Sequence, residues 1–562
     1  MSDLRIGVFV CHCGANIGGV VNVPEVTEYA SGLEDVVYAK DNLYTCSDAG
    51  LREIKDSIKE YDLNRVVVAS CTPRTHERLF RNTCEEAGLN RFLFEFVNIR
   101  DQCSWVHMQD PESATEKAKD LVRMGVAKSR LLNPMEEIEI DVLPVAMVIG
   151  GGIAGMSAAK SLAGMGISTY LIEREPQLGG MLNKLNALYP SHERAVDFIK
   201  PVKEAVLNHP KIEVLTSAQI KDIRGFIGSY NVEVQQAETS RSLKVGAIIV
   251  ATGAQALTPE GFYGYDGQNV VTQLEFEQIL ADSDKVAELE NVVMIQCVGA
   301  RSEERVYCSR VCCTAAVKNG LLLKEAKPDA QVFILFRDIQ TYASDFEDYY
   351  FGARDKGVIF VRYAKDHPPE VTDSVVRVYD QLLGVQLGMP YDLIVLSTPL
   401  IPHDDAKELA TMLKVPLDEN GFFLEAHVKL RPVDFATDGI YLAGCARWPS
   451  HVGEAVSQAQ AAVSRAAIPL LNGRVRVEPI VSRVDEELCI GCELCESLCP
   501  FKAIQVKMTD SGRKAQVITA SCKGCGACGA ACPQHAITMQ HFTNLQIEAQ
   551  IDAMAAAMVS GD

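Results

Sequence analysis

The chain opens with short apolar runs that alternate with helical patterns. Strand-like runs occupy Ile6–Val10, Val66–Ala69 and Phe92–Val97, and segments of helical spacing lie between them at Gly50–Glu60 and Arg78–Ala87. Strands that alternate with helices are typical of a parallel sheet. Such sheets bind ligands at the carboxyl ends of their strands, so residues just past the strand ends are candidates for chemistry.

A second α/β region begins with the apolar strand Val145–Ile149, after an acidic, proline-bounded stretch at Asn133–Pro144 that indicates a linker. The composition shifts again near Asn472–Glu478, ahead of a compact cysteine-rich segment. In the tail, apolar residues at helical spacing predict a short amphipathic helix that could pack on its own domain or dock a partner: Ile547, Ile551, Met554 and Met558.

Composition narrows the class of protein. A chain of 562 residues with a net charge of −20 repels nucleic acid and anionic membranes. It has no apolar run long enough to span a membrane, and its start lacks the pattern of a secretory signal. Of its 19 cysteines, six lie in 11–103, four in 297–313 and eight in 489–532. In such a chain this favours metal or redox chemistry over structural disulfides.

The strand at Val145–Ile149 leads into a dinucleotide-binding turn. Gly150, Gly152 and Gly155 form G-x-G-x-x-G at the start of a helix rich in small residues. Glycines at this spacing let a pyrophosphate approach the helix N-terminus. Glu173, at the end of the next strand, is placed to accept hydrogen bonds from a ribose.

The order of later motifs resembles the two-dinucleotide flavoproteins of the thioredoxin reductase type, which implies a bound FAD. In that family an acidic residue follows the final glycine and contacts the ribityl chain, whereas this chain has Cys445 there. Beyond the first turn and Glu173, the residues expected to hold FAD are Ile153, Ala154, Arg174, Gly179, Gly180, Met181, Ala251, Thr252, Gly253, Gly444 and Cys445.

These flavoproteins carry a second glycine-rich turn for NAD(P)H, and that turn is missing here. The corresponding strand, Asn291–Ile295, runs into Cys297, and Cys308, Cys312 and Cys313 follow. We expect these four thiolates to hold an iron–sulfur cluster that exchanges electrons with the flavin. The alternative is a vicinal dithiol at Cys312–Cys313 beside two core cysteines.

Two copies of the bacterial ferredoxin motif C-x2-C-x2-C-x3-C-P make up the cysteine-rich segment, a pattern that zinc does not require. In such pairs the fourth cysteine of each motif binds the other cluster. The predicted ligands are therefore Cys489, Cys492, Cys495 and Cys532 for the first [4Fe–4S] cluster, and Cys522, Cys525, Cys528 and Cys499 for the second.

The N-terminal cysteines predict a further cluster with less detail. A cluster needs four ligands, and one of the five candidates is therefore a spectator. The candidates are Cys11, Cys13, Cys46, Cys71 and Cys103. Cys84 lies in a helical pattern and is expected in the core. His12, His76 and His107 leave a zinc or mixed site as the alternative.

The whole chain resembles the A-type subunits of heterodisulfide reductases. The resemblance rests on VCHCGANIGG (10–19), VASCTPRTHERLF (68–80), NIRDQCSWVH (98–107), QCVGAR…YCSRVCC (296–313), the long segment LFRDIQTYASDFEDYYFGARDKGVIFVR (335–362), the flavin motif and the ferredoxin pair. The resemblance implies a cytoplasmic flavin-centred electron hub of anaerobic metabolism, with flavin-based electron bifurcation to ferredoxin. Arg337 and Lys356, in the long segment, are candidate flavin neighbours.

The family further implies partners: subunits of the B and C type, an electron-input subunit linked to a hydrogenase or dehydrogenase, ferredoxin, and dimers within a larger hetero-oligomer. Many members have an inserted ferredoxin domain and a cysteine pair after Leu-Tyr-Pro, and both are absent after Leu188–Pro190. Bifurcation therefore competes with a non-bifurcating relay to a quinone-linked or aromatic-acyl-CoA reductase. A plain NAD(P)H oxidoreductase is disfavoured by the missing second turn.

The predicted fold is thus a multidomain α/β protein with an α+β ferredoxin domain. The expected boundaries are 1–133 for an N-terminal Rossmann-like α/β iron–sulfur domain, 134–144 for a linker, 145–285 and 401–472 for the FAD domain, 286–400 for a degenerate nicotinamide-like domain, 473–541 for the ferredoxin domain and 542–562 for the tail helix.

Overall fold

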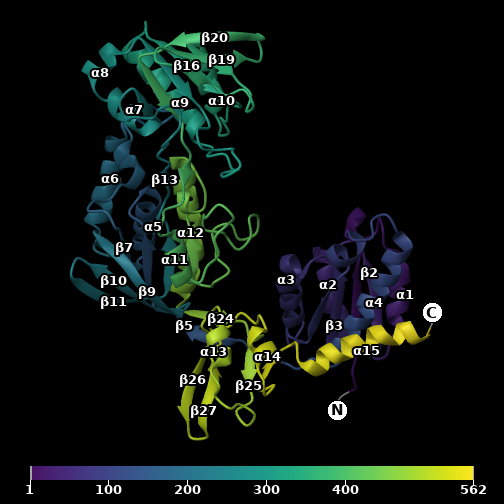
Figure 1. Ribbon diagram of the computed structural model, residues 1–562. Helices are drawn as coiled ribbons and strands as arrows, with labels where there is room; N and C mark the ends of the chain where they lie inside the picture. The colour runs from purple at the N-terminus through teal and green to yellow at the C-terminus, as the bar shows by residue number, and fades with distance from the viewer. Residues whose placement is uncertain (1–2, 561–562) are drawn as a thin grey trace. The chain divides into compact units, whose positions relative to one another are not determined.

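The computed structural model describes residues 3–560, with side chains to residue 556. It divides into two compact units, which we describe separately (Figure 1). The first unit joins the two ends of the chain, residues 1–139 and 476–562, and the second unit spans residues 140–475. The N-terminal domain and the ferredoxin segment, distant in sequence, therefore belong to one unit.

The N-terminal domain is a parallel sheet covered on both faces. Its strand order is β2–β1–β3–β4, with bounds Val36–Asn42, Ile6–Cys11, Arg65–Ser70 and Phe94–Asn98. Helices α1 (Val23–Ser31) and α4 (Pro111–Ser129) bury one face. Helices α2 (Asp48–Glu60) and α3 (Pro73–Glu86) bury the other. Apolar side chains alternate between these two cores along β1, so the sheet is packed on both sides.

The ferredoxin segment consists of two strand pairs and two short helices. The strand pairs are β25 (Ser482–Val484) with β28 (Ile537–Met539) and β26 (Ile504–Thr509) with β27 (Gly512–Val517); the helices are α13 (Leu494–Leu498) and α14 (Ala527–Ala531). The two halves repeat the same helix-and-strand pattern, as the repeated cysteine motif predicts.

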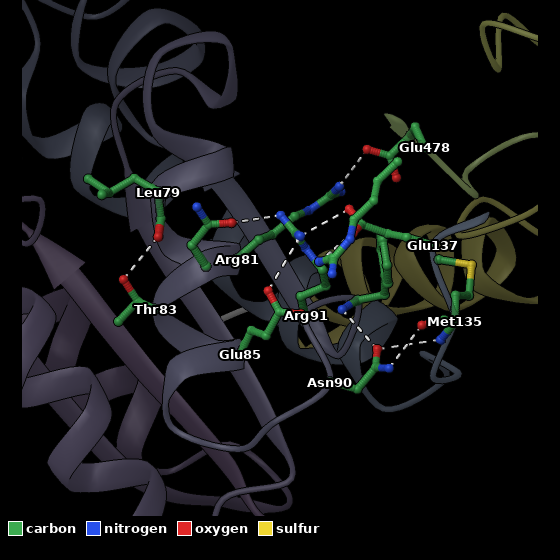
Figure 2. A network of polar contacts seen from close by, with 12 residues as sticks. Leu79, Arg81, Thr83, Glu85, Asn90, Arg91, Met135, Glu137 and Glu478 are labelled. Atoms are coloured by element: carbon green, nitrogen blue, oxygen red, sulfur yellow. Dashed lines mark hydrogen bonds and ion pairs between the residues drawn. The ribbon is translucent and has the colours of Figure 1, made fainter. Parts of the chain in front are cut away.

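Arginines of the N-terminal domain contact the two segments where the chain leaves and re-enters the first unit (Figure 2). Arg81 on α3 donates to Glu478 at 3.1 Å, and Arg91 forms an ion pair with Glu137 at 2.9 Å. Asn90 Nδ2 donates to the carbonyl of Met135 at 2.9 Å. The predicted linker therefore begins as a segment fastened to the domain.

The tail forms helix α15 (Asn544–Ser560), which packs on α4 (Figure 1). Gln546 Nε2 donates to the carbonyl of Leu131 at 2.9 Å, and Arg123 Nε donates to the carbonyl of Ala553 at 2.7 Å. The apolar stripe that predicts the helix is exposed at Ile547, Ile551 and Met554, and the side chain of Met558 lies outside the described residues. The helix therefore docks through a different face from the predicted one.

The second unit contains a parallel sheet of the dinucleotide-binding type. Its order is β23–β12–β6–β7–β8, with bounds Ile440–Leu442, Ala247–Val250, Val145–Ile149, Ser168–Ile172 and Ile212–Leu215. Helices α5 (Ile153–Gly164), α6 (Ala195–Leu207) and α12 (Val452–Asn472) cover one face. The antiparallel strands β9 (Ala218–Phe226), β10 (Ser229–Gln236) and β11 (Thr239–Val245) and helix α11 (Ala406–Leu413) cover the other.

A second parallel sheet follows in the order β14–β21–β15–β16–β17, with bounds Val270–Thr272, Leu393–Leu396, Asn291–Ile295, Gln331–Phe336 and Val358–Arg362. Helices α7 (Gln273–Leu280), α8 (Ser283–Glu288), α9 (Cys312–Ala326) and α10 (Phe346–Asp355) cover one face. Strands β18 (Glu370–Val371), β19 (Val375–Asp380) and β20 (Val385–Pro390) form the small sheet of the other face.

The boundary expected at residue 285, between the first part of the FAD domain and the next domain, is wrong. Strand β14 pairs in the second sheet and helix α7 packs against that sheet, so the second sheet's domain begins earlier. Three-residue strands such as β14 are too short to show a hydrophobic period. Among residues 3–560, no helix combines the length and apolarity needed to cross a bilayer.

Candidate functional site: a dinucleotide-binding turn and four cysteine groups

The turn after β6 has the geometry of a pyrophosphate cradle. Gly150 adopts a φ of 109°, and a Cβ on Gly155 would lie 1.8 Å from the carbonyl oxygen of Gly150, so helix and strand meet at a distance that only glycine permits. A Cβ on Gly152 would meet no atom within 4 Å. The turn is thus tight on its inner side and open at Gly152, where a ligand could approach.

Glu173 closes the inner side of this cradle. Its carboxylate is buried and accepts from the N–H of Gly151 at 2.6 Å and from the N–H of Glu175 at 2.8 Å. Arg174 points elsewhere, because its guanidinium pairs with Asp405 at 3.0 Å and lies 2.7 Å from Nδ1 of His403. Arg174 is therefore engaged in surface contacts with the second part of the FAD domain.

The other predicted flavin residues gather around the same turn. The N–H of Gly179 donates to the carbonyl of Gly151 at 2.8 Å, and a Cβ on Gly180 would lie 3.1 Å from the Cα of Gly152. On the opposite side, Gly150 lies against Ala251, which precedes Thr252 and Gly253, and Gly444 approaches Ala154. Ile153 and Met181 are partly buried nearby in the chain. The glycines of the predicted set thus come together around one turn, whereas Arg174 does not join them.

Cys445 occupies the position where the flavoprotein family has an acidic residue. Its thiol donates to the carbonyl of Ser450 at 3.3 Å, and burial raises its pKa. A neutral, hydrogen-bonded thiol cannot replace a carboxylate as a strong acceptor for a ribityl hydroxyl. Gly444 N–H instead donates to Oε1 of Gln458 at 3.0 Å, which orders this corner from α12.

A group of four cysteines, Cys297, Cys308, Cys312 and Cys313, extends from the end of β15 to the start of α9. The interaction between the adjacent thiols of Cys312 and Cys313 raises the pKa of Cys312 and lowers that of Cys313. Electrostatic interactions with Cys297 and Cys308 add to the rise at Cys312, so all four thiols lie near one another. The N–H of Arg310 donates to the sulfur of Cys308 at 3.3 Å.

Two arginines border this group. Burial raises the pKa of Cys297 and the neighbouring Cys313 adds to the rise, whereas the guanidinium groups of Arg337 and Arg301 oppose it. Arg337, expected as a flavin neighbour, therefore lies at the cysteines. Lys356 pairs with Glu325 at 2.8 Å on the surface, with 53% of its side chain exposed.

Four of the five N-terminal candidates gather at the carboxyl edge of the first sheet. Cys11 ends β1, Cys13 lies in the turn after it, Cys71 follows β3, and Cys46 lies between β2 and α2. Burial raises the pKa of Cys13 and Cys46, and the neighbouring thiols of Cys11 and Cys71 raise it further. Four thiols from three strand ends therefore share one edge.

Polar groups around these thiols suit a sulfur-rich ligand. The N–H of Thr45 donates to the sulfur of Cys11 at 3.4 Å, and the buried hydroxyl of Thr45 has no partner among the described residues. His12 is turned to Asp41, with Nε2 2.8 Å from Oδ2. The guanidinium of Arg100 opposes the rise in the pKa of Cys13 and lies 4.7 Å from the ring centre of Trp105.

Cys103 is separate from this group. It is completely buried in the core beneath α1 and α4, and its thiol donates to the carbonyl of Ala114 at 3.0 Å. Burial raises its pKa to about 11. Cys84 is also a core thiol, as expected, and burial raises its pKa to about 12.

In the ferredoxin segment, one cavity is lined by the first three cysteines of the first motif and the last of the second: Cys489, Cys492, Cys495 and Cys532. Near the second motif, the hydroxyl of Ser482 lies 3.1 Å from the sulfur of Cys528 and 3.7 Å from that of Cys522. Cys499 accepts from the N–H of Ala503 at 3.2 Å. Among residues 3–560, no three Cys, His, Asp or Glu side chains are arranged to hold a single metal ion.

Comparisons with known proteins agree with these two kinds of site. Residues 145–297 match the family model described as pyridine nucleotide-disulphide oxidoreductase, and residues 482–539 match that of a 4Fe-4S dicluster domain. Among solved structures, the thioredoxin reductase of Lactococcus lactis is 19% identical and covers 58% of this chain and 99% of its own, with a TM-score of 0.42.

Curated relatives match over nearly the full length. The chain is 40% identical to the A-type subunit of the H(2):CoB-CoM heterodisulfide,ferredoxin reductase of Methanothermobacter thermautotrophicus, covering 98% of both chains. It is 36% identical to the A-type subunit of the H(2)/formate:CoB-CoM heterodisulfide,ferredoxin reductase of Methanococcus maripaludis, covering 99% of both. The first alignment spans 653 positions, more than the 562 residues here, so that relative has segments this chain lacks. The chain is an FAD and iron–sulfur oxidoreductase, and it belongs to the family of heterodisulfide reductase A-type subunits.

Proposed function

We propose that this chain is the electron-distributing subunit of a heterodisulfide-reductase-type complex, with one FAD and four [4Fe–4S] clusters. The flavin supplies the exchange between electron pairs and single electrons, and the clusters carry single electrons. One observation carries the proposal: cysteines stand where the second sheet would bind a nicotinamide dinucleotide. Cys297 comes two residues after β15, and α9 opens with Cys312 and Cys313.

The N-terminus of α9 favours an anionic group at this place. A helix N-terminus carries a partial positive charge, which stabilises an anionic group such as a thiolate-bound cluster. A Gly-rich turn would be needed for a pyrophosphate to reach the same backbone. The arrangement therefore suits a thiolate-bound cluster and disfavours a hydride donor.

Contacts between the cluster loop and the flavin helix support electron exchange between them. Arg310 lies between Cys308 and Cys312, and its guanidinium contacts Oε1 of Glu454, in the first turn of α12, at 2.9 Å. Burial raises the pKa of Tyr189, and Tyr342, Cys312 and Cys445 add to the rise, so Tyr189 is close to both cysteines. The cysteine group is thus near the corner where α12 begins.

For the remaining clusters we propose three ligand sets. The N-terminal cluster uses Cys11, Cys13, Cys46 and Cys71, with Cys103 as the spectator. The ferredoxin clusters use Cys489, Cys492, Cys495 and Cys532, and Cys522, Cys525, Cys528 and Cys499, in agreement with the cavity at the first motif.

We further propose that the complex couples a two-electron donor to ferredoxin and a high-potential acceptor. This extends to the present chain the donors and acceptors in the names of its relatives. The partners would be B- and C-type subunits and an input protein linked to a hydrogenase or dehydrogenase. The second candidate is a non-bifurcating relay, because this chain lacks segments that a relative carries: their alignment spans 653 positions, against 562 residues here.

Stopped-flow absorbance of the anaerobic full chain tests the cluster-fed flavin. We expect NADH and NADPH to leave the flavin absorbance unchanged on the timescale of seconds, and dithionite to bleach it. Rapid bleaching by either nucleotide would contradict the proposal. In the copurified complex, ferredoxin reduction should require the high-potential acceptor; reduction without it would favour the relay.

A further inference from the structure

Arg337 is fastened to the loop that carries Cys297. It follows β16, and its guanidinium donates to the carbonyl of Ala300 at 2.8 Å and to that of Arg301 at 3.1 Å. The same guanidinium opposes the rise in the pKa of Cys297, so it lies near that thiol. Its Nε–H is buried and has no hydrogen-bond partner among the described residues. One side chain therefore holds the backbone of this loop and lies near the predicted ligand.

The loop depends on such a clamp because its backbone is unusual. Cys297 has a φ of 63° and Arg301 a φ of 52°, in the left-handed region that disfavours residues with a Cβ. Gly299, with a φ of 75°, lies between them. Two hydrogen bonds from Arg337 hold the carbonyls at the end of this loop, which fixes where Cys297 presents its sulfur.

The charge of Arg337 is not balanced by an acid. Arg301 pairs with Asp338 at 2.7 Å, and Arg362 contacts the same carboxylate at 3.1 Å. Within residues 3–560, Arg337 forms no ion pair with a carboxylate, and its guanidinium donates to two backbone carbonyls. A guanidinium stays protonated in proteins, so a permanent positive charge lies near Cys297.

This charge has a predictable effect on a cluster at Cys297, Cys308, Cys312 and Cys313. One-electron reduction adds one negative charge and breaks no bond. A nearby fixed positive charge stabilises the reduced form more than the oxidised form, and low internal polarity strengthens the effect.

We propose that Arg337 is a positioning residue that holds Cys297 and raises the reduction potential of the cluster bound there. The inference rests on the proposed function, because it requires that cluster. The electrostatic interaction of a nearby full charge is large enough to change the reduction equilibrium by about tenfold, which is about 59 mV for one electron.

The test is a redox titration of the anaerobic full chain, followed by electron paramagnetic resonance, on Arg337→Gln and Arg337→Lys. Arg305→Gln is the matched control, because Arg305 lies in the same loop and pairs with Glu304. We expect the midpoint of one cluster to fall by about 59 mV or more in Arg337→Gln. Arg337→Lys should restore part of the fall, and the control should match the wild type.

An unchanged midpoint in Arg337→Gln with full iron content would overturn the inference and leave the proposed function intact. If Arg337→Gln loses the iron of that cluster, Arg337→Lys decides, since lysine keeps the positive charge: a cluster retained near the wild-type midpoint supports the inference, and a cluster that is lost or whose midpoint falls as far as expected for Arg337→Gln overturns it. If the wild-type protein lacks the iron of a cluster at Cys297, Cys308, Cys312 and Cys313, the proposed function is overturned instead.

Discussion

Replacing Gly155 by alanine should abolish FAD binding without unfolding the chain. The added Cβ would lie 1.8 Å from the carbonyl oxygen of Gly150, and real Cβ contacts essentially never fall under 3.0 Å. The clashing atom belongs to the backbone, so it cannot rotate away and α5 must move roughly 1 Å or more from the turn. Overpacking of this kind costs about 1–3 kcal/mol. That shift displaces the N–H groups of the helix N-terminus from the pyrophosphate they would bind.

Gly164→Ala is the matched control, because Gly164 ends the same helix and a Cβ there meets nothing within 4 Å. Alanine there should cost nothing and could stabilise α5 by up to about 1 kcal/mol. The assay is flavin absorbance per polypeptide after anaerobic purification, with iron measured in the same samples. Equal flavin content in Gly155→Ala and Gly164→Ala would refute the argument.

Three further predictions concern other parts of the chain. Lys318 and Glu277 form an ion pair with 1% and 2% of their side chains exposed, so Lys318→Met should lower the free energy of unfolding by about 3–5 kcal/mol, and adding Glu277→Gln should restore part of it; equal stabilities in denaturant titration would contradict this. Cys71→Ser should remove about four irons while Cys103→Ser keeps them, and the opposite pattern would reverse the ligand assignment. Hydrogen bonds from backbone N–H groups lower the pKa of Asp266 below its usual 3.8. The contribution of this carboxylate to the free energy of unfolding is therefore complete above pH 3.8 and is lost as the pH falls through the lower pKa of the folded state. Asp266→Asn should flatten the dependence of the free energy of unfolding on pH in that acid range, and an unchanged dependence would argue against the assignment.

The strand and helix pattern can be predicted where burial is complete. Strands β1 and β3 are apolar runs, and their predicted bounds agree with the structure within one residue at each end. Strand β2 (Val36–Asn42) escapes prediction because it lies at the sheet edge with partly exposed residues on both faces, so it shows neither an apolar run nor a clean alternation.

The sequence also predicts some residues of the candidate site and not others. Motif spacing predicts the flavin turn and the ferredoxin cysteines because those ligands are close in sequence. It does not show which N-terminal cysteine stands apart, since Cys103 and Cys71 both follow strands and only the third dimension places Cys103 in the core. The sequence predicts Arg337 near the flavin, and no local pattern shows that its guanidinium reaches the loop of Cys297.

The iron and flavin content of the anaerobically purified chain tests the central claim most directly. Four clusters of four irons predict about sixteen irons with one FAD per chain. About eight irons, retained by a fragment limited to the ferredoxin segment, would mean that the cysteines after β15 and at the edge of the first sheet hold no clusters.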